Sequence, residues 1–442
     1  MNADAREHYL AECARAAPNL PGAHVPWLAR MRGAALVAFE QRGFPSRREE
    51  EWKYTSVAEF LRHRFHVVPD GRGADAAASL ARRFALEHDA AHLLVFHNGR
   101  YAPALSAPGR LPAGVVLGSL ADALNTAPDI LQPYLSSEDQ PLAFSALNAA
   151  FMADGAYLHL QRDTVLEAPL HLLFLSTEAG GASYPRNVIV AEAGAHASVI
   201  EHYAGTDDLT YFTNAVTRIF AEANAVIEHH KLQQEGCGAF HVAGIHAIQG
   251  RDSRVESHSF TLGAALTRND IATVFDASGC ETTLSGLYLA GASQHVDNHT
   301  CIDHRHPNGT SRQNYRGVLD GRSHAVFNGK VIVHPAAQKT NAYQANHNLL
   351  LSNDAEIDTK PQLEICADDV KCGHGATVGR LDETQLFYLR SRGIDEIVAR
   401  NMLVHAFAHD VIDRIRVPSL RTRLEQFLLS RLPQENLMRE LS

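Results

Sequence analysis

Apolar residues recur at intervals of three and four along the first third of the chain, which is the spacing of amphipathic helices. The pattern predicts helices over Ala5–Ala17, Trp27–Gln41 and Leu142–Met152, and prolines separate the first two. One short apolar run, Leu93–Phe96, predicts a strand. This part of the chain is therefore predicted to be mainly helical.

From Ala156 to about Val378 the helical spacing fades, and short β-type runs alternate with Gly, Asn and Asp turns. The predicted strands are Tyr157–Leu160, Leu170–Leu175, Asn187–Val190, Ala197–Tyr203, Val216–Phe220, Ala225–Leu232, Ser257–Thr261 and Ala325–Val333. Ala191–Ala195 recurs as Ala221–Ala225, and Val199–His202 recurs as Val226–His229. A period of roughly 27–30 residues is typical of a β-solenoid with one coil per repeat. A pair of β-sandwiches is the alternative that this pattern leaves open.

Helical spacing returns in about the last sixty residues. Helices are predicted over Asp382–Arg392, which Gly393 would end, and over Ile394–Ile415, and Pro418 would open a third. The changes in the spacing of apolar residues predict a mainly helical N-terminal domain (1–154), a β core (155–378) and a helical C-terminal domain (379–442).

The formal charge of −10 argues against a nucleic-acid surface and against docking on an anionic membrane. No apolar run is long enough to span a bilayer, and the N-terminus carries no secretory signal pattern. We therefore expect a cytoplasmic protein whose six cysteines are free thiols.

Several common catalytic motifs are missing from the sequence. There is no Walker A loop, HExxH or GxSxG, and Gly373–Gly379 does not match the dinucleotide fingerprint. These absences remove the commonest enzyme classes and leave rarer ones open.

The first candidate for chemistry is a polar run at His295–His306. In an extended strand, alternate side chains share one face. The metal-competent residues His295, Asp297, His299, Cys301 and Asp303 would then line up. Such a mixed set suits Fe or Zn, while the structural alternative is a ladder of His–Asp hydrogen bonds on a polar solenoid face.

The second candidate is the pair Cys372 and His374, which are two residues apart and would project to the same face. Lys371 is expected to favour the thiolate of Cys372, and the flanking glycines to leave His374 reachable. Two ligands do not make a closed metal site, so further ligands would have to come from elsewhere, for example from another chain. A turn with a hydrogen-bonded histidine is the structural alternative.

A charged stretch with two aromatic residues lies at Phe44–Thr55. It is predicted to begin a helix capped by Ser46 and supported by a Glu49–Lys53 pair.

Long segments of the C-terminal half resemble the SufB/SufD family. They are Gln338–Ser352, Ala355–Ile365, Asp368–Gly379 and Phe387–Ile394, with Gly286–Leu289 and Val318–Gly321 upstream. The matches span about residues 260–415. The motif Arg48-x-Glu50-x-Trp52-Lys53-Tyr54-Thr55 and the compact N-terminal region resemble the SufD branch in particular.

This resemblance implies a right-handed parallel β-helix between helical N- and C-terminal domains. It also implies a non-catalytic scaffold subunit in iron–sulfur cluster assembly, which pairs with its SufB paralogue and docks the ATPase SufC through its C-terminal helices. ATP hydrolysis would belong to SufC, which agrees with the missing Walker loop. No cofactor would be permanently bound, because the cluster is transient at the SufB interface.

The resemblance also carries residue roles. It implies a cluster or iron ligand at His374, and less directly at Cys372. The expected SufC contact region contains Arg390, Arg392, Ile394, Met402 and Phe407. The alternatives left open are a polysaccharide-active β-helix enzyme, a stand-alone metal-binding protein that uses His295–His306, and a homodimer of the isolated chain.

Overall fold

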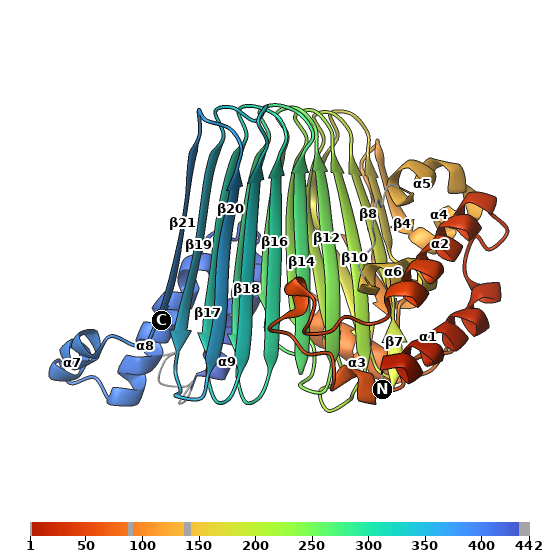
Figure 1. Cartoon of the computed structure of the whole chain (residues 1–442). Helices are drawn as coiled ribbons and strands as arrows, with labels where there is room; N and C mark the ends of the chain where they lie inside the picture. Colours follow the sequence, from red (N-terminus) through yellow and green to blue (C-terminus); the bar gives the residue numbers. More distant parts are fainter. Residues whose placement is uncertain (1, 87–91, 137–142, 433–442) are drawn as a thin grey trace.

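The computed structural model describes residues 2–86, 92–136 and 143–432. Its centre is a β-solenoid in which the chain alternates between two parallel sheets (Figure 1). This confirms the predicted fold class, a solenoid with helices on either side, and excludes the pair of sandwiches. None of the helices in these ranges is long and apolar enough to cross a membrane.

Sheet A follows the order β20-β18-β16-β14-β12-β10-β8-β5-β4, and β7 and β1 join it beside β10. Its strands are β1 (His66–Val67), β4 (Val115–Ser119), β5 (Ala156–Leu160), β7 (Gly181–Ser183), β8 (Arg186–Ala191), β10 (Phe212–Ala221), β12 (Phe240–Gln249), β14 (Leu266–Phe275), β16 (His295–His304), β18 (His324–Val333) and β20 (Glu356–Ile365).

Sheet B follows the order β21-β19-β17-β15-β13-β11-β9-β6-β2-β3. Its strands are β2 (His92–His97), β3 (Arg100–Tyr101), β6 (Val165–Ser176), β9 (His196–Gly205), β11 (Val226–Gln234), β13 (Arg254–Thr261), β15 (Glu281–Ala290), β17 (Thr310–Leu319), β19 (Asn341–Leu350) and β21 (Lys371–Gly379).

The repeat seen in the sequence corresponds to one type of tight turn between the sheets. Gly194, Asn224, Asp252, Gly279 and Asn308 occupy matching turns of successive coils, each with a positive φ between 57° and 77°. Glycine, asparagine and aspartate tolerate this left-handed conformation better than other residues do. The recurring segments Ala191–Ala195 and Ala221–Ala225 are therefore two copies of this turn.

Side chains alternate between the lumen of the solenoid and its outer face. The lumen is largely apolar, and aromatic rings from successive coils stack inside it. The ring of Phe174 lies 4.8 Å from that of Phe96 and 4.7 Å from that of Tyr203. Burial of such rings in register stabilises the stack of coils.

The N-terminal region covers one end of the solenoid and part of the outer face of sheet A (Figure 1). Its helices are α1 (Asn2–Ala16), α2 (Pro26–Arg42), α3 (Ala74–Phe84), α4 (Leu120–Thr126), α5 (Pro128–Leu135) and α6 (Ala143–Phe151), with the 3-10 turns η1 (Ala17–Asn19), η2 (Glu50–Trp52), η3 (Phe60–Arg62) and η4 (Pro103–Leu105). Phe60 lies at the centre of the contact, and its ring is 4.7 Å from Phe212 at the start of β10.

The C-terminal helices are α7 (Glu383–Ser391), α8 (Glu396–Ile412) and α9 (Pro418–Arg431). Helices α8 and α9 bury apolar residues against the outer face of sheet B, where they meet Leu232, Phe260 and Leu287. Helix α7 projects beyond the last coil (Figure 1). Gly393 follows it with a φ of 87°, as expected for a helix stop.

Two details differ from the sequence prediction. Residues Phe44–Thr55 form no capped helix; the stretch contains only η2, and the Glu49 carboxylate accepts the backbone N–H of Ser46. The apolar runs also left out β12 and most strands of the later coils, from β14 to β17 and from β19 to β21. Leu142, the predicted start of the third helix, lies outside the described residues, and α6 begins at Ala143. The domain boundaries at 154 and 378 stay predictions.

Candidate functional site

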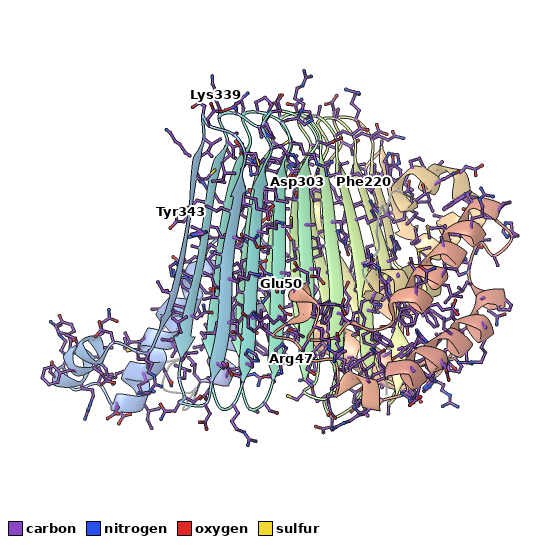
Figure 2. All side chains as sticks on the ribbon, viewed as in Figure 1. Arg47, Glu50, Phe220, Asp303, Lys339 and Tyr343 are labelled. Atoms are coloured by element: carbon purple, nitrogen blue, oxygen red, sulfur yellow. The ribbon has the colours of Figure 1, made fainter. Side chains whose placement is uncertain are left out.

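The solenoid ends abruptly at β20 and β21. Within the described ranges, β20 is hydrogen-bonded to β18 alone and β21 to β19 alone, so each leaves one edge unpaired. Several apolar side chains near this end are unusually exposed: Tyr343 at 59%, Val378 at 48% and Ile365 at 41%. Figure 2 shows Tyr343 near this open end, far from the N-terminal helices.

The register of β21 places the predicted ligand pair at the mouth of the lumen. Cys372 pairs with Ala342 and His374 pairs with Gln344, and both partners on β19 are buried on the lumen side. Because residues paired in a parallel sheet share a face, Cys372 and His374 also face the lumen side. No further coil follows β21 in the part of the chain that the structure describes, and here His374 is exposed and Cys372 is half-buried.

The expected activation of Cys372 by Lys371 is wrong. Burial raises the pKa of the Cys372 thiol, and Lys371 is its neighbour in a strand, so the two side chains point to opposite faces. Gly373 and Gly375 also face outward, and a Cβ on either would meet no described atom within 4 Å. It is the end of the solenoid, rather than the glycines, that exposes His374.

Among residues 2–86, 92–136 and 143–432, no third metal ligand completes a group with Cys372 and His374. The described residues contain two groups of three or more metal-ligating side chains, and neither group includes this pair. The sequence-based expectation that further ligands must come from elsewhere is therefore consistent with the geometry.

The polar run at His295–His306 is instead an attachment point for the N-terminal region. His295, Asp297 and His299 line up on the outer face of β16, where residues of the segment Glu50–Thr55 cover them. The Thr55 hydroxyl contacts Asp297 Oδ2 at 2.5 Å and His295 Nε2 at 2.8 Å, and Glu51 Oε2 lies 3.1 Å from His299 Nδ1. The hydrogen-bonded structural alternative therefore accounts for this cluster.

Charges fix the protonation states in this contact. Burial opposes ionisation of Asp297, but the Arg268 guanidinium, 2.6 Å away, holds the pKa of that carboxyl well below its usual range. Burial alone would lower the pKa of His299, but the charge of Asp297 and its hydrogen bond raise it to about 9. Burial lowers the pKa of His295 to about 4. Arg268 also stacks on Trp52, 4.5 Å from the ring centroid.

A second link runs along the same face. Lys360 Nζ of β20 lies 2.5 Å from Glu50 Oε1. Figure 2 shows Glu50 over the outer face of sheet A. The segment Glu50–Thr55 thus ties the N-terminal region to coils near the open end.

The residues predicted to contact an ATPase lie in different environments. Arg390 and Arg392 are exposed, and Arg392 stacks over Tyr388 at 4.3 Å. Ile394 and Met402 are half-buried. Phe407 is also half-buried, and Arg316 stacks on its ring at 4.9 Å and donates a hydrogen bond to its carbonyl.

Sequence reasoning missed two residues of α7. Phe387 is 72% exposed and Tyr388 is 55% exposed, and Leu386 is the buried residue of this helix. The apolar run Leu386–Leu389 is wider than one face of a helix, which is a signal that could have singled them out.

The lumen also contains charged residues that no sequence pattern singled out. Glu201 Oε1 lies 3.1 Å from His229 Nε2, and Glu235 Oε2 lies 2.7 Å from His241 Nδ1, all fully or almost fully buried. Burial opposes the charge of Glu201, yet the neighbouring His229 keeps its pKa below the ordinary value. His229 also contacts the Ser257 hydroxyl at 3.1 Å, whereas neither ring nitrogen of His241 makes a hydrogen bond of good geometry.

The chain matches two family models. Residues 174–407 match the SufBD core domain of the SUF system for FeS cluster assembly, and residues 4–172 match the SufBD protein N-terminal region. An iron–sulfur cluster assembly SufBD family protein of Synechocystis is 36% identical over 408 residues, covering 90% of this chain and 89% of the relative. The iron–sulfur cluster assembly protein SufD of Escherichia coli is 34% identical over 401 residues, covering 88% and 90%. The SufD protein of Bacillus subtilis is 24% identical over 411 residues, covering 90% and 92%. The chain therefore belongs to the SufB/SufD family of iron–sulfur cluster assembly proteins, and within that family it is most like SufD.

Proposed function

We propose that this chain is a scaffold subunit that pairs with a SufB paralogue through the open end of its solenoid and presents His374 to a nascent iron–sulfur cluster. The observation that carries the proposal is the position of His374 on the lumen side of β21, the last strand of its sheet, which leaves one edge unpaired within the described residues. The cluster is cargo in this scheme, and the remaining ligands come from the partner.

The edge of β21 offers backbone groups for such pairing. The N–H of Lys371 bonds the carbonyl of Thr340 towards β19. Since successive residues of a strand alternate their hydrogen-bonding direction, the N–H groups of Cys372, His374 and Ala376 point away from β19. An exposed edge of this kind recruits a strand from another chain.

The two side chains at the open end of the lumen would bind iron one after the other, His374 before Cys372. His374 is exposed and carries a donor nitrogen for iron. Burial keeps the Cys372 thiol protonated near neutral pH, so it would become a ligand only when a metal ion displaces its proton. His374 is therefore the first contact and Cys372 the conditional one.

The docking of SufC is assigned to α7 and the start of α8. Phe387 and Tyr388 form an exposed aromatic pair, and Arg390 and Arg392 lie beside it. Aromatic residues and arginines are typical of the anchors that stabilise protein–protein interfaces. A movement of the bound ATPase would be transmitted to the solenoid through α8. Arg316 of β17 holds this helix by a hydrogen bond to the Phe407 carbonyl and an ion pair with Asp410.

The test is His374→Ala in the complex assembled with SufB and SufC. We expect the complex to remain intact in gel filtration and cluster formation to be lost in anaerobic reconstitution followed by absorption spectroscopy. His347→Ala is the matched control, because His347 lies on the outer face of β19 and bonds Thr377. A normal cluster yield from His374→Ala would contradict the assignment.

A further inference from the structure

A second group of ligand-type side chains lies on the outer face of sheet B, away from the open end. In the register of β11 and β13, Glu228 pairs with Glu256 and His230 pairs with His258. The two imidazole rings stack with centroids 5.1 Å apart and an interplanar angle of 17°. Ile227, next to Glu228, belongs to the core of the lumen, so the Glu–His ladder faces outward.

These side chains are buried and only partly satisfied. Glu228 is 6% exposed, His230 0% and His258 2%. Within the described part of the chain, His230 Nδ1 and His258 Nε2 make no hydrogen bond, and Glu228 Oε1 and His230 Nε2 contact only each other, as an ion pair without good hydrogen-bond geometry. Buried polar atoms normally have partners, so several unsatisfied ones at one place indicate a missing ligand.

The three atoms converge on one point. His230 Nε2 and Glu228 Oε1 are 3.2 Å apart, and with His258 the three ligand atoms all lie within 4.8 Å of one another. The Ser285 hydroxyl lies 2.6 Å from His258 Nδ1 and orients the ring so that Nε2 faces the other two. An outer partner of this kind is typical of metal-ligating histidines.

We propose that Glu228, His230 and His258 bind a divalent first-row transition-metal ion such as Fe²⁺ or Zn²⁺. Two imidazole nitrogens and one carboxylate oxygen form a ligand set that such ions favour over Mg²⁺ or Ca²⁺. Water completes the coordination, or Glu256, whose Oε2 lies 3.8 Å from His258 Nε2.

The charged side chains nearest to this group leave it with a net negative charge. Arg416 is bound to Glu256 at 3.2 Å, so Glu228, Glu256 and Arg416 together carry one negative charge.

A route from the surface exists. His258 and Glu256 line a cavity of about 480 Å³ beside Arg416, which lies between α8 and α9. Four arginines line this cavity, and three of them are paired with a carboxylate: Arg254 with Glu281, Arg414 with Asp410 and Arg416 with Glu256. The fourth is Arg312. A hydrated ion can therefore reach His258 without unfolding the coil.

The other group of three potential ligands provides a matched control. His324, Glu356 and Asp358 lie on sheet A, where Glu356 is exposed and His324 Nε2 already bonds Asp358 at 2.8 Å. This group lacks the buried, unsatisfied atoms of the first, so we expect His324→Ala to leave tight metal binding unchanged.

The experiment titrates the metal-free isolated chain with Co²⁺ and with Zn²⁺ under anaerobic conditions. We expect one tight equivalent, a Co²⁺ spectrum without a thiolate-to-cobalt charge-transfer band, and a rise in Tm with metal. Glu228→Gln, which keeps the side-chain volume, and His258→Gln are each expected to weaken binding at least tenfold and to reduce the rise in Tm. His324→Ala and Cys372→Ser are the controls.

Unchanged affinity in Glu228→Gln and His258→Gln would overturn the proposal, as would the absence of a tight equivalent in the wild-type chain. Loss of the tight site in Cys372→Ser would also overturn it, because the metal would then lie at the open end. If His258→Gln does not fold, the near-isosteric Glu228→Gln decides the question alone. The measurement needs no partner, so its result is independent of the proposed scaffold role.

Discussion

The two ends of the solenoid differ in what covers them. At the N-terminal end, β4 and β2 pair with the first coil and six helices pack around it, with Phe60 1% exposed at the centre. At the C-terminal end, β20 and β21 leave their edges unpaired within the described residues, and Tyr343 and Val378 are about half exposed. The edges left unpaired among the described residues are the ones that the proposed pairing with a partner strand would use.

The largest difference between the two ends is expected in their contribution to stability. Phe60→Ala removes a ring that packs on Phe144, Phe212 and Phe240, and should lower the free energy of unfolding by about 3–5 kcal/mol. Tyr343→Ala at the open end should change it by no more than about 0.5 kcal/mol. Urea denaturation of the isolated chain measures both, and equal costs would show that the open end is as well packed as the closed one.

The attachment of the N-terminal region should depend on pH through His299. The pKa of His299 is raised from about 6.5 to about 9, so its stabilising charge is fully present below pH 6.5 and is lost as the pH rises through 9. The loss should reach about 3 kcal/mol, since one pKa unit corresponds to about 1.4 kcal/mol.

Urea denaturation at pH 6.5 and pH 9 checks this prediction. His299→Gln should be less stable than the wild type at pH 6.5 and should lose most of the difference between the two pH values. A wild-type profile that is flat over this interval would contradict the assigned contact with Asp297.

The exposed aromatic pair of α7 should matter for binding and hardly for folding. Phe387→Ser combined with Tyr388→Ser should change the free energy of unfolding by no more than about 0.5 kcal/mol, because both rings are exposed. The same double variant should weaken binding of SufC, measured by calorimetry. Val37→Ser, which alters another exposed apolar residue, is the control, and equal binding by both variants would remove α7 from the docking surface.

Local sequence patterns predicted the fold where one type of residue dominates. The matching tight turns at Gly194 and Asn224 were visible as a sequence repeat, because only a few residue types suit the positive φ angle of these turns. The strands β16 and β17 were not predicted, because their outer faces carry histidine, aspartate and arginine. These residues interrupt the apolar run on which the prediction of a strand relies. The family resemblance supplied what the pattern lacked.

The candidate site was predicted in part. The spacing of Cys372 and His374 correctly placed them on one face, and the resemblance singled out His374. Their position at the mouth of the lumen depends on where the solenoid stops, which no local pattern specifies. The expectation for Lys371 failed because neighbours in a strand point to opposite faces. The Glu228–His230–His258 group was missed because its ligands come from adjacent coils, 28 residues apart at His230 and His258.

The most direct test of the open end is Ala376→Pro in β21. Its N–H points away from β19, so proline keeps the fold of the isolated chain but removes one donor for an incoming strand and blocks its approach. Ala376→Val, which keeps the N–H, is the control. We predict that Ala376→Pro melts like the wild type but no longer co-purifies with SufB, whereas Ala376→Val does. Undiminished pairing of Ala376→Pro with SufB would contradict the account.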